Sequence, residues 1–335
     1  MKFSNGCWLQ KEGCSCFAPA EAYFTKIEEK KVTICAPTAH IVTRGDTLGG
    51  INLTLEITSP APEILRVRTY HYKGEVVNTP SFELELKEEL PLDVTDSEEE
   101  ISIKSGELTL VITKKNWSMT YYRNGEMITR SAGRDLALMK TDFKGFAYND
   151  TDAEETYMRQ MLSLSVGELV YGTGERFTPF VKNGQSIDIW NADGGTSTEQ
   201  SYKNIPFFIT NKGYGVLVNH PEKVSIEVAT EMVTRTEFSV PGGYLDYFLI
   251  NGPTMKEVLT RYTDLTGKPS LPAPWTFGLW LSTSFTTNYD EATVMSFIDG
   301  MLDRGIPLRT FHFDCFWMKE FHWSDFVWDN RVFPD

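Results

Sequence analysis

Alternation of apolar and polar residues is the dominant pattern in the first 250 residues. It runs through INLTLEIT at 51–58, SFELELKEEL at 81–90 and ISIKSGELTLVIT at 101–113. Successive side chains of a β-strand point to opposite faces, so a period of two predicts strands with one buried face. Half-buried strands of this kind are typical of antiparallel sheets. We therefore expect sheets, and not helices, in this part of the chain.

Two turn signals divide this strand-rich region into hairpins. Asn124-Gly125 separates SMTYYR from EMITR, and the segment Asn211-Lys212-Gly213 separates IPFFIT from YGVLVNH. Asn and Gly tolerate the positive φ that tight hairpin turns require. Since no internal repeat is visible, the simplest interpretation of residues 1–250 is one large N-terminal β-sandwich domain.

The hydrophobic period changes after residue 252. Thr254 and Glu257 form a capping box, in which each side chain bonds the backbone amide of the other residue. Apolar residues then recur at helical spacing, at Met255, Val258, Leu259, Tyr262 and Leu265. Gly267 and the proline-rich segment PSLPAP end the pattern. Residues 251–274 are thus predicted to be a connecting helix and a linker.

Residues 275–335 show a third arrangement. An apolar run at 276–281 predicts a strand, a helix capped by Asn288 follows, and LRTFHFD at 308–314 predicts a second strand. A strand, helix and strand in this order form a βαβ unit, whose strands are parallel. Parallel strands are normally covered on both faces, and one such unit leaves them exposed. We therefore expect the chain to be cut short within this domain.

Charge and composition exclude several classes of partner. The formal net charge of −14 argues against nucleic acid, which attracts basic surfaces. No apolar run reaches the roughly 18 residues of a membrane span. MKFSNGCWLQ lacks the apolar stretch of a secretory signal, so a cytoplasmic location with reduced thiols is expected. A homo-oligomer is compatible with the sequence.

Neither a metal nor a cofactor is predicted. Cys14 and Cys16 form a C-x-C pair, but no histidine lies nearby at zinc-finger spacing. The glycine-rich segment 172–176 lacks the third glycine and the following helix of a phosphate-binding loop. We interpret it as a tight turn that places Arg176 as a structural or cleft cation. Six of the eight tryptophans lie in the second half of the chain, which suits core packing and sugar stacking equally.

The loops after the two predicted parallel strands are the candidate sites of chemistry. In parallel barrels, functional residues follow the carboxyl ends of the strands. Here these are residues 282–285, which include Phe285, and Asp314-Cys315-Phe316-Trp317. Packing at the barrel mouth explains the aromatic residues equally well. Cys315 as a nucleophile needs a base and an orienting group, and none is evident.

Several motifs together resemble one family. VYGTGERF, WNADGGTSTEQSYKNIPFFIT, GYGVLVNHP, LPAPWTFGLWLSTSFTTNYDEATV and FHFDCFWM occur in this order. They are similar to segments of glycoside hydrolase family 31, and within it to the bacterial α-xylosidases. The resemblance is strong from residue 170 to residue 335 and weaker before it. It implies a galactose-mutarotase-like β-sandwich followed by a (β/α)8 TIM barrel, of which residues 275–335 are the first two strands.

The resemblance also implies a reaction and a substrate. Family members are retaining α-glycosidases with two catalytic aspartates, and the Lys-x-Asp-x-Gly-Glu type segment of the nucleophile has no counterpart in these 335 residues. No catalytic residue is therefore assigned, and the isolated chain is expected to be inactive. The expected substrate is an α-xyloside or a xyloglucan-type oligosaccharide. An α-glucosidase of the same family and a non-catalytic carbohydrate-binding fragment remain alternatives.

By the same resemblance, six residues contact the substrate: Asp193, Phe285, Asp314, Cys315, Phe316 and Trp317. The second aspartate of the family's Asp-Ile-Asp-Tyr-Met type motif is replaced here by Phe316. A ring in place of a carboxylate removes a hydroxyl partner and fills volume, which favours a pentose over a hexose. For Asp193, an Asx turn before Gly194-Gly195 is the competing interpretation.

Overall fold

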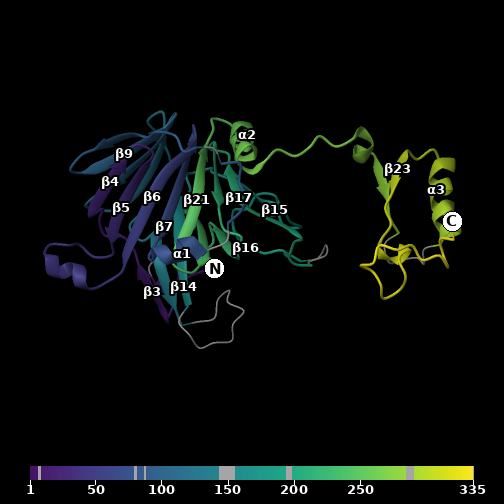
Figure 1. Ribbon diagram of the computed structural model, residues 1–335, viewed down its shortest axis with the longest axis horizontal. Helices are drawn as coiled ribbons and strands as arrows, with labels where there is room; N and C mark the ends of the chain where they lie inside the picture. The colour runs from purple at the N-terminus through teal and green to yellow at the C-terminus, as the bar shows by residue number, and fades with distance from the viewer. Residues whose placement is uncertain are drawn as a thin grey trace. The chain divides into compact units, whose positions relative to one another are not determined.

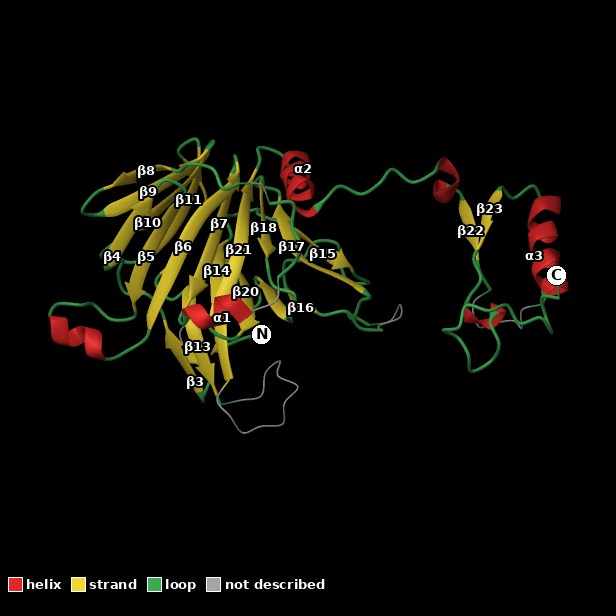
Figure 2. Cartoon of the chain, in the orientation of Figure 1, coloured by secondary structure: helices red, strands yellow, loops and turns green. Residues whose placement is uncertain are grey.

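The chain forms two compact units, Met1–Gly267 and Lys268–Asp335. The computed structural model describes residues 1–6, 9–78, 81–86, 88–142, 155–193, 198–283 and 290–334. Strands dominate the first unit, whereas the second is small and mixed (Figures 1 and 2). Within the described residues, no helix has both the length and the apolar character needed to cross a membrane.

The largest sheet of the first unit has eight antiparallel strands in the order β15-β17-β18-β21-β7-β6-β5-β4. Their bounds are β4 (Phe24–Glu28), β5 (Lys31–Pro37), β6 (Asn52–Ala61), β7 (Ile64–Tyr70), β15 (Val170–Glu175), β17 (Lys203–Thr210), β18 (Tyr214–Val218) and β21 (Tyr244–Asn251). Every residue of β21 is buried, so this strand lies inside the domain and not on its surface.

Two further antiparallel sheets complete the sandwich. The six-stranded sheet has the order β16-β19-β20-β14-β13-β3, and the five-stranded sheet has the order β12-β11-β10-β9-β8. Their bounds are β3 (Cys14–Phe17), β8 (Asp93–Asp96), β9 (Glu100–Ser105), β10 (Leu108–Thr113), β11 (Ser118–Arg123), β12 (Glu126–Ala132), β13 (Leu136–Thr141), β14 (Glu155–Ser163), β16 (Gln185–Ile189), β19 (Val224–Val228) and β20 (Arg235–Pro241). A short ribbon pairs β1 (Ser4–Asn5) with β2 (Leu9–Gln10).

One apolar core joins the three sheets. It includes Ile34 of the largest sheet, Ile103 of the five-stranded sheet and Phe238 of the six-stranded sheet, all fully buried. The hydroxyls of Tyr121 and Tyr247 lie 2.8 Å apart inside this core and satisfy each other. Because buried polar groups are costly without a partner, this hydrogen bond favours the observed packing of the five-stranded sheet against the largest sheet.

Local sequence signals are confirmed where they specify backbone geometry. Asn124 and Gly125 have φ of 49° and 82°, and they connect β11 to β12 as predicted. The segment 211–213 connects β17 to β18. The capping box of Thr254 and Glu257 begins α2 (Met255–Thr266). This helix packs on β17, β18 and β21, with the ring of Tyr262 stacked on Phe207 at 4.0 Å.

Three local predictions are wrong. Residues 81–86 and 88–90 form no strand. The side chains of Phe82 and Leu84 are nevertheless partly buried. The alternation in this segment therefore indicates burial and not strand pairing. The segment 172–176 is not a tight turn, since most of it continues β15. The helix predicted to begin at Asn288, which lies outside the described residues, is capped by Asp290.

The second unit contains the predicted βαβ arrangement. β22 (Leu279–Leu281) pairs with β23 (Leu308–Phe311) in parallel, and α3 (Glu291–Asp303) connects them. β22 begins later than predicted, because residues 274–277 form a 3₁₀ turn, η2 (Pro274–Phe277). β23 ends at Phe311 and not at the predicted residue 314. A second such turn, η3 (Cys315–Trp317), follows β23. The first unit also carries η1 (Arg44–Leu48) and the short helix α1 (Lys73–Asn78).

Candidate functional site

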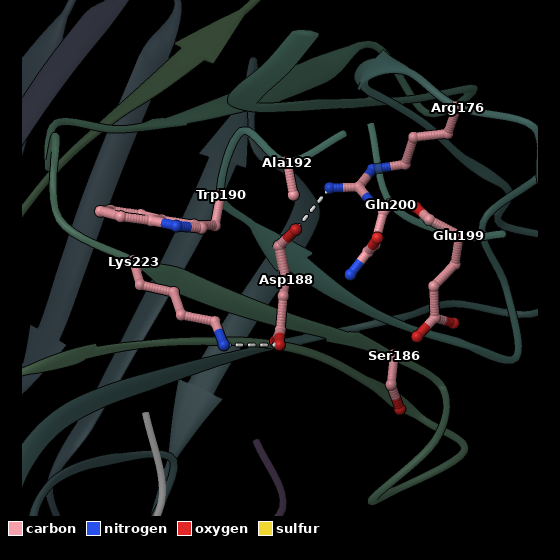
Figure 3. A pocket seen from close by; sticks show the side chains of 8 residues that line it. All are labelled: Arg176, Ser186, Asp188, Trp190, Ala192, Glu199, Gln200 and Lys223. Atoms are coloured by element: carbon pink, nitrogen blue, oxygen red, sulfur yellow. Dashed lines mark hydrogen bonds and ion pairs between the residues drawn. The ribbon is translucent and has the colours of Figure 1, made fainter. Parts of the chain in front are cut away.

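A cavity of about 450 Å³ opens in the first unit beside the end of β15. Its wall comes from β15's continuation, from β16 and the loop after it, and from the residue before β19 (Figure 3). The lining residues are Arg176, Ser186, Asp188, Trp190, Ala192, Glu199, Gln200 and Lys223. The wall therefore combines charged, amide and hydroxyl groups with a single aromatic ring.

A backbone irregularity in β15 determines where this wall begins. The pairing with β17 shifts register between Gly172 and Gly174. Gly174 has φ of +90°, and a Cβ there would lie 2.2 Å from the carbonyl oxygen of Lys203. Only glycine permits this close approach of two strands. The irregularity ends the strand just before Arg176 and directs the chain into the cavity wall.

Arg176 is a structural cation of the site. Its Nη1 donates to the carbonyl oxygen of Glu199 at 3.0 Å, and its Nη2 donates to that of Asp188 at 2.5 Å. The same nitrogen also donates to the side-chain oxygen of Asn204. Burial lowers the pKa of the guanidinium, which still stays charged at neutral pH. Arg176 thus connects the wall segments of Asp188 and Glu199, and most of its N–H groups donate to protein oxygens.

An ion pair crosses the floor of the cavity. Nζ of Lys223 lies 2.9 Å from Oδ2 of Asp188. The side chain of Asp188 is half-exposed, at 51%, so a ligand can reach its carboxylate from the cavity. The pair presents an acceptor and a donor side by side (Figure 3).

Trp190 supplies the apolar surface. Its side chain is 46% exposed, and it lines both this cavity and a second one of about 240 Å³. The second cavity also contains Phe82, His220 and Glu222. An exposed ring next to paired donors and acceptors suits a polyhydroxylated ligand, whose C–H face stacks while its hydroxyls form hydrogen bonds. Among the described residues, no group of three or more His, Cys, Asp or Glu side chains could hold a metal ion.

Asp193 does not line this cavity, but it follows the lining residue Ala192 directly in the chain. Its side chain is exposed, and its Oδ1 accepts a hydrogen bond from the hydroxyl of Tyr202. This bond raises the pKa of Tyr202. The loop is held by a hydrogen bond of 2.9 Å from the amide of Ala192 to the carbonyl of Ser201. Whether Asp193 forms an Asx turn depends on residues 194–197, which lie outside the described residues.

The other predicted substrate residues belong to the second unit. Asp314 caps η3, because its Oδ1 accepts from the amide of Cys315 at 2.6 Å. Burial and the bond to Asp314 raise the pKa of the Cys315 thiol, which disfavours a thiolate nucleophile. Phe316 packs edge-on against Trp323, and Trp317 packs against Trp328 at 4.8 Å. Phe285 lies outside the described residues.

Sequence reasoning missed much of the cavity wall. It did not single out Asp188, Glu199, Gln200 or Lys223, although the alternation in QSIDIW contains a usable signal. Ile187 and Ile189 are buried, so the residues between them, Ser186 and Asp188, face the other side together with Trp190. The ion pair with Lys223 has no sequence signal, since it joins neighbouring strands across a long stretch of chain.

Comparisons with known proteins match this architecture. Residues 54–227 match the glycosyl hydrolase 31 N-terminal galactose mutarotase-like domain, and residues 269–335 match the glycosyl hydrolases family 31 TIM-barrel domain. The expected fold class, a mutarotase-like sandwich followed by the start of a TIM barrel, is confirmed.

Two curated relatives are similar over the whole chain. The chain is 44% identical to alpha-xylosidase XylQ of Lactiplantibacillus pentosus and 43% identical to an alpha-xylosidase of Emericella nidulans, with 100% of this chain aligned in both cases. It spans 43% and 44% of their lengths. Among solved structures, the cycloalternan-forming enzyme of Listeria monocytogenes has a TM-score of 0.74 at 19% identity, covering 95% of this chain and 28% of that one.

Proposed function

Since the chain belongs to glycosyl hydrolase family 31, we propose that it takes part in the hydrolysis of α-linked xylosides. The observation that carries this proposal is its identity of 44% and 43% with two α-xylosidases along its entire length. The chain corresponds to less than half of each relative, so the proposal concerns the part of the reaction that these residues serve.

We assign these residues to substrate recognition and not to bond cleavage. Retaining glycosidases use two carboxyl groups about 5 Å apart, one as nucleophile and one as general acid and base. The nucleophile attacks the anomeric carbon while the acid protonates the leaving oxygen, and water then releases the sugar. We propose neither role for any residue of the present sequence. The four residues from Asp314 to Trp317 form one wall of the proposed pocket for the terminal sugar, and Phe285 is a further expected substrate contact that lies outside the described residues.

The preferred sugar follows from the chemistry of this wall. The carboxylate of Asp314 accepts a hydrogen bond from a sugar hydroxyl, in addition to the bond from the amide of Cys315. Phe316 offers a ring where a carboxylate would bind a further hydroxyl. A hexose would leave the hydroxyl of its CH₂OH arm without a partner there, whereas xylose lacks that arm. Xylose is therefore preferred over glucose.

We propose separately that the cavity around Trp190, in the first unit, binds a sugar unit of an oligosaccharide. Its exposed ring and the ion pair of Asp188 with Lys223 support this assignment, and Asp193, the residue after Ala192, is the proposed additional carboxylate. A sugar that stacks on an aromatic side chain loses this contact when the ring is removed, but another aromatic ring can replace it. Trp190→Ala should weaken the use of oligosaccharides, and Trp190→Phe should retain most of it.

The decisive experiment compares nitrophenyl α-xyloside, nitrophenyl α-glucoside and a xyloglucan oligosaccharide as substrates of the product of the complete reading frame. We expect the xyloside to have the higher kcat/KM of the two nitrophenyl substrates, and Trp190→Ala to reduce kcat/KM for the oligosaccharide more than for the xyloside. Tyr23→Ala, which removes another half-exposed ring of the sandwich, is the matched control. A higher kcat/KM for the glucoside than for the xyloside would contradict the proposed specificity.

A further inference from the structure

A further polar cavity, distinct from the two that Trp190 lines, lies on the outer face of the six-stranded sheet, in the first unit. It has a volume of about 220 Å³, and β14, β3 and the turn after β12 contribute to it. Its lining residues include Arg134, Arg159 and Arg235, together with Asp135, Glu231 and Cys16. None of these residues lines the cavity around Trp190, so the two cavities are separate.

The pattern of β14 explains how an arginine becomes buried here. Met158 and Leu162 of this strand face the main core. Tyr157 and Arg159 therefore face the opposite side. There the N-terminal segment covers the sheet, and Phe3 packs with Tyr157, Ala137 and Met139. The guanidinium of Arg159 lies 5.8 Å from the centre of the Phe3 ring, so this cover places an aromatic ring over the cation.

Among the residues that the structure describes, no carboxylate pairs directly with Arg159, although only 5% of this residue is exposed. It forms no ion pair within 4.0 Å with any described residue. Its Nε has no hydrogen-bond partner there either. One Nη donates to the carbonyl of Arg134 and, more weakly, to the sulfur of Cys16. Burial alone would lower the pKa of this guanidinium, but its acidic neighbours, chiefly Glu237, Glu231 and Asp135, raise it from a distance. None of them bonds Nε directly, and buried polar groups are costly without a partner, so an anionic ligand in the cavity would satisfy this donor.

The carboxylates of the cavity already have donors of their own. Asp135 accepts from Nε of Arg235 at 3.1 Å and from the amide of Ala132 at 2.9 Å. Glu231 accepts from the amide of Phe3 at 2.8 Å and from the hydroxyl of Ser4. Arg134 is exposed at the entrance, and no described residue accepts a hydrogen bond from its side chain. Three guanidinium groups thus face two carboxylates, with a positive balance.

Two further acids near Arg159 do not reverse this balance. Glu237 is 1% exposed, and both of its carboxyl oxygens are without hydrogen-bond partners among the described residues. Burial raises the pKa of Glu237 to about 8, so this side chain is largely neutral at pH 7. Burial also raises the pKa of the Cys16 thiol, which stays protonated.

We propose that this cavity is a binding site for a small oxyanion of the phosphate class, held by Arg159 at its base and by Arg134 at its entrance. Guanidinium groups bind phosphate oxygens through parallel N–H donors. The volume accommodates inorganic phosphate or the phosphate group of a small phosphorylated metabolite. The site is independent of sugar hydrolysis and lies on the sandwich alone.

Calorimetric titration of the 335-residue chain with inorganic phosphate and, separately, with glycerol 2-phosphate tests the proposal. Sodium chloride at matched ionic strength controls for general screening. We expect saturable binding of at least one ligand in the millimolar range or tighter. Tighter binding of inorganic phosphate would identify the free ion as the ligand, and tighter binding of the ester would identify a phosphorylated metabolite. Absence of saturable binding of both ligands up to about 20 mM, well above a Kd of about 1 mM, would overturn the proposal.

Variants locate the site without relying on a buried substitution. Arg134→Ala changes an exposed residue and should weaken binding about tenfold. Arg44→Ala, at an exposed position in η1, should leave it unchanged. Arg159→Gln should weaken binding further, and its circular dichroism spectrum shows whether the variant folds. Unchanged affinity in Arg134→Ala would overturn the assignment, even if Arg159→Gln does not fold.

Discussion

The hydroxyl of Tyr202 donates a hydrogen bond to Oδ1 of Asp193, across the loop that leaves β16 and returns into β17. This contact orients the one carboxylate of the sandwich that the sequence motif WNADGG assigns to substrate recognition. Both side chains are exposed, so the bond contributes little to the stability of the domain. Its effect is the direction in which the carboxylate points.

Tyr202→Phe should therefore lower activity without lowering stability. Removing the hydroxyl frees Asp193 to rotate, and we expect kcat/KM for a xyloglucan oligosaccharide to fall about threefold, the effect of a weak exposed hydrogen bond. The measurement is steady-state kinetics on the product of the complete reading frame, together with its melting temperature. Tyr23→Phe is the control, since Tyr23 is similarly exposed on the sandwich. Equal kcat/KM in Tyr202→Phe and the parent would show that the hydroxyl of Tyr202 does not orient Asp193 for substrate binding.

Arg176→Met should destabilise the first unit. Arg176 holds the carbonyl groups of Asp188 and Glu199 and the partly buried side-chain oxygen of Asn204, and its loss leaves these three acceptors unpaired. We expect a loss of about 2 kcal/mol in the free energy of unfolding, as for hydrogen bonds to charged groups. Urea denaturation of the 335-residue chain measures it. Lys203→Met breaks only an exposed pair with Glu175 and should change stability by less than about 1 kcal/mol. Similar losses in both variants would contradict the structural role of Arg176.

Gly174→Ala separates steric exclusion from backbone strain. Gly174 and Gly167 both have positive φ, but a Cβ on Gly174 would lie 2.2 Å from the backbone of Lys203, whereas a Cβ on Gly167 meets nothing within 4 Å. Strain alone costs about 1–2 kcal/mol. We expect Gly174→Ala to cost at least about 2 kcal/mol more than Gly167→Ala, because β15 must move away from β17. Equal costs in urea denaturation would show that the strands tolerate the methyl group.

These residues show which parts of the structure the sequence could predict. The hairpin at Asn124-Gly125 and the capping box of Thr254 were predictable because each depends on side chains within three or four positions of one another. The region 81–90 was not. Leu84 is partly buried against the cluster that contains Leu265, and the amide of Glu85 bonds the carbonyl of Leu265. Its alternation therefore reflects contact with α2 and not with a neighbouring strand.

The candidate site was predictable only in part. The motifs led to Asp193 and to the segment from Asp314 to Trp317, whose positions relative to a substrate stay predictions. The role of Arg176 as a clamp on two carbonyl groups depends on backbone atoms that carry no sequence signal. The pair of Asp188 and Lys223 forms because β16 and β19 lie side by side, which no local pattern indicates.

Glu237→Gln should flatten the pH dependence of stability. The pKa of Glu237 is raised by burial to about 8 from an ordinary value of 4.5. Between these values the folded chain holds a proton that the unfolded chain has released, so this group's contribution to stability falls as pH rises from about 4.5 to about 8. For this one group, the slope of the unfolding free energy against pH reaches at most about 1.4 kcal/mol per pH unit.

Urea denaturation at pH 5, 6, 7 and 8 compares this variant with the parent. The difference in unfolding free energy between Glu237→Gln and the parent should grow in favour of the variant as pH rises. Glu107→Gln, which changes an exposed glutamate in the turn before β10, should follow the parent at each pH. A constant difference between Glu237→Gln and the parent would mean that Glu237 ionises normally.

Phe316→Asp should change the sugar preference of the enzyme. In the proposed pocket wall, Phe316 replaces a carboxylate that would bind an additional hydroxyl, so the substitution is expected to offer glucose an acceptor and to open volume for its CH₂OH arm. We expect the ratio of kcat/KM for nitrophenyl α-glucoside to that for the α-xyloside to rise about tenfold, the range of one hydrogen bond or methylene in a pocket. Phe321→Asp is a matched control, because its ring is 92% exposed and stacks on the same Trp323 that Phe316 contacts. It should lower both rates equally or not at all. An unchanged ratio in Phe316→Asp, with activity retained on the xyloside, would show that this ring does not select the sugar.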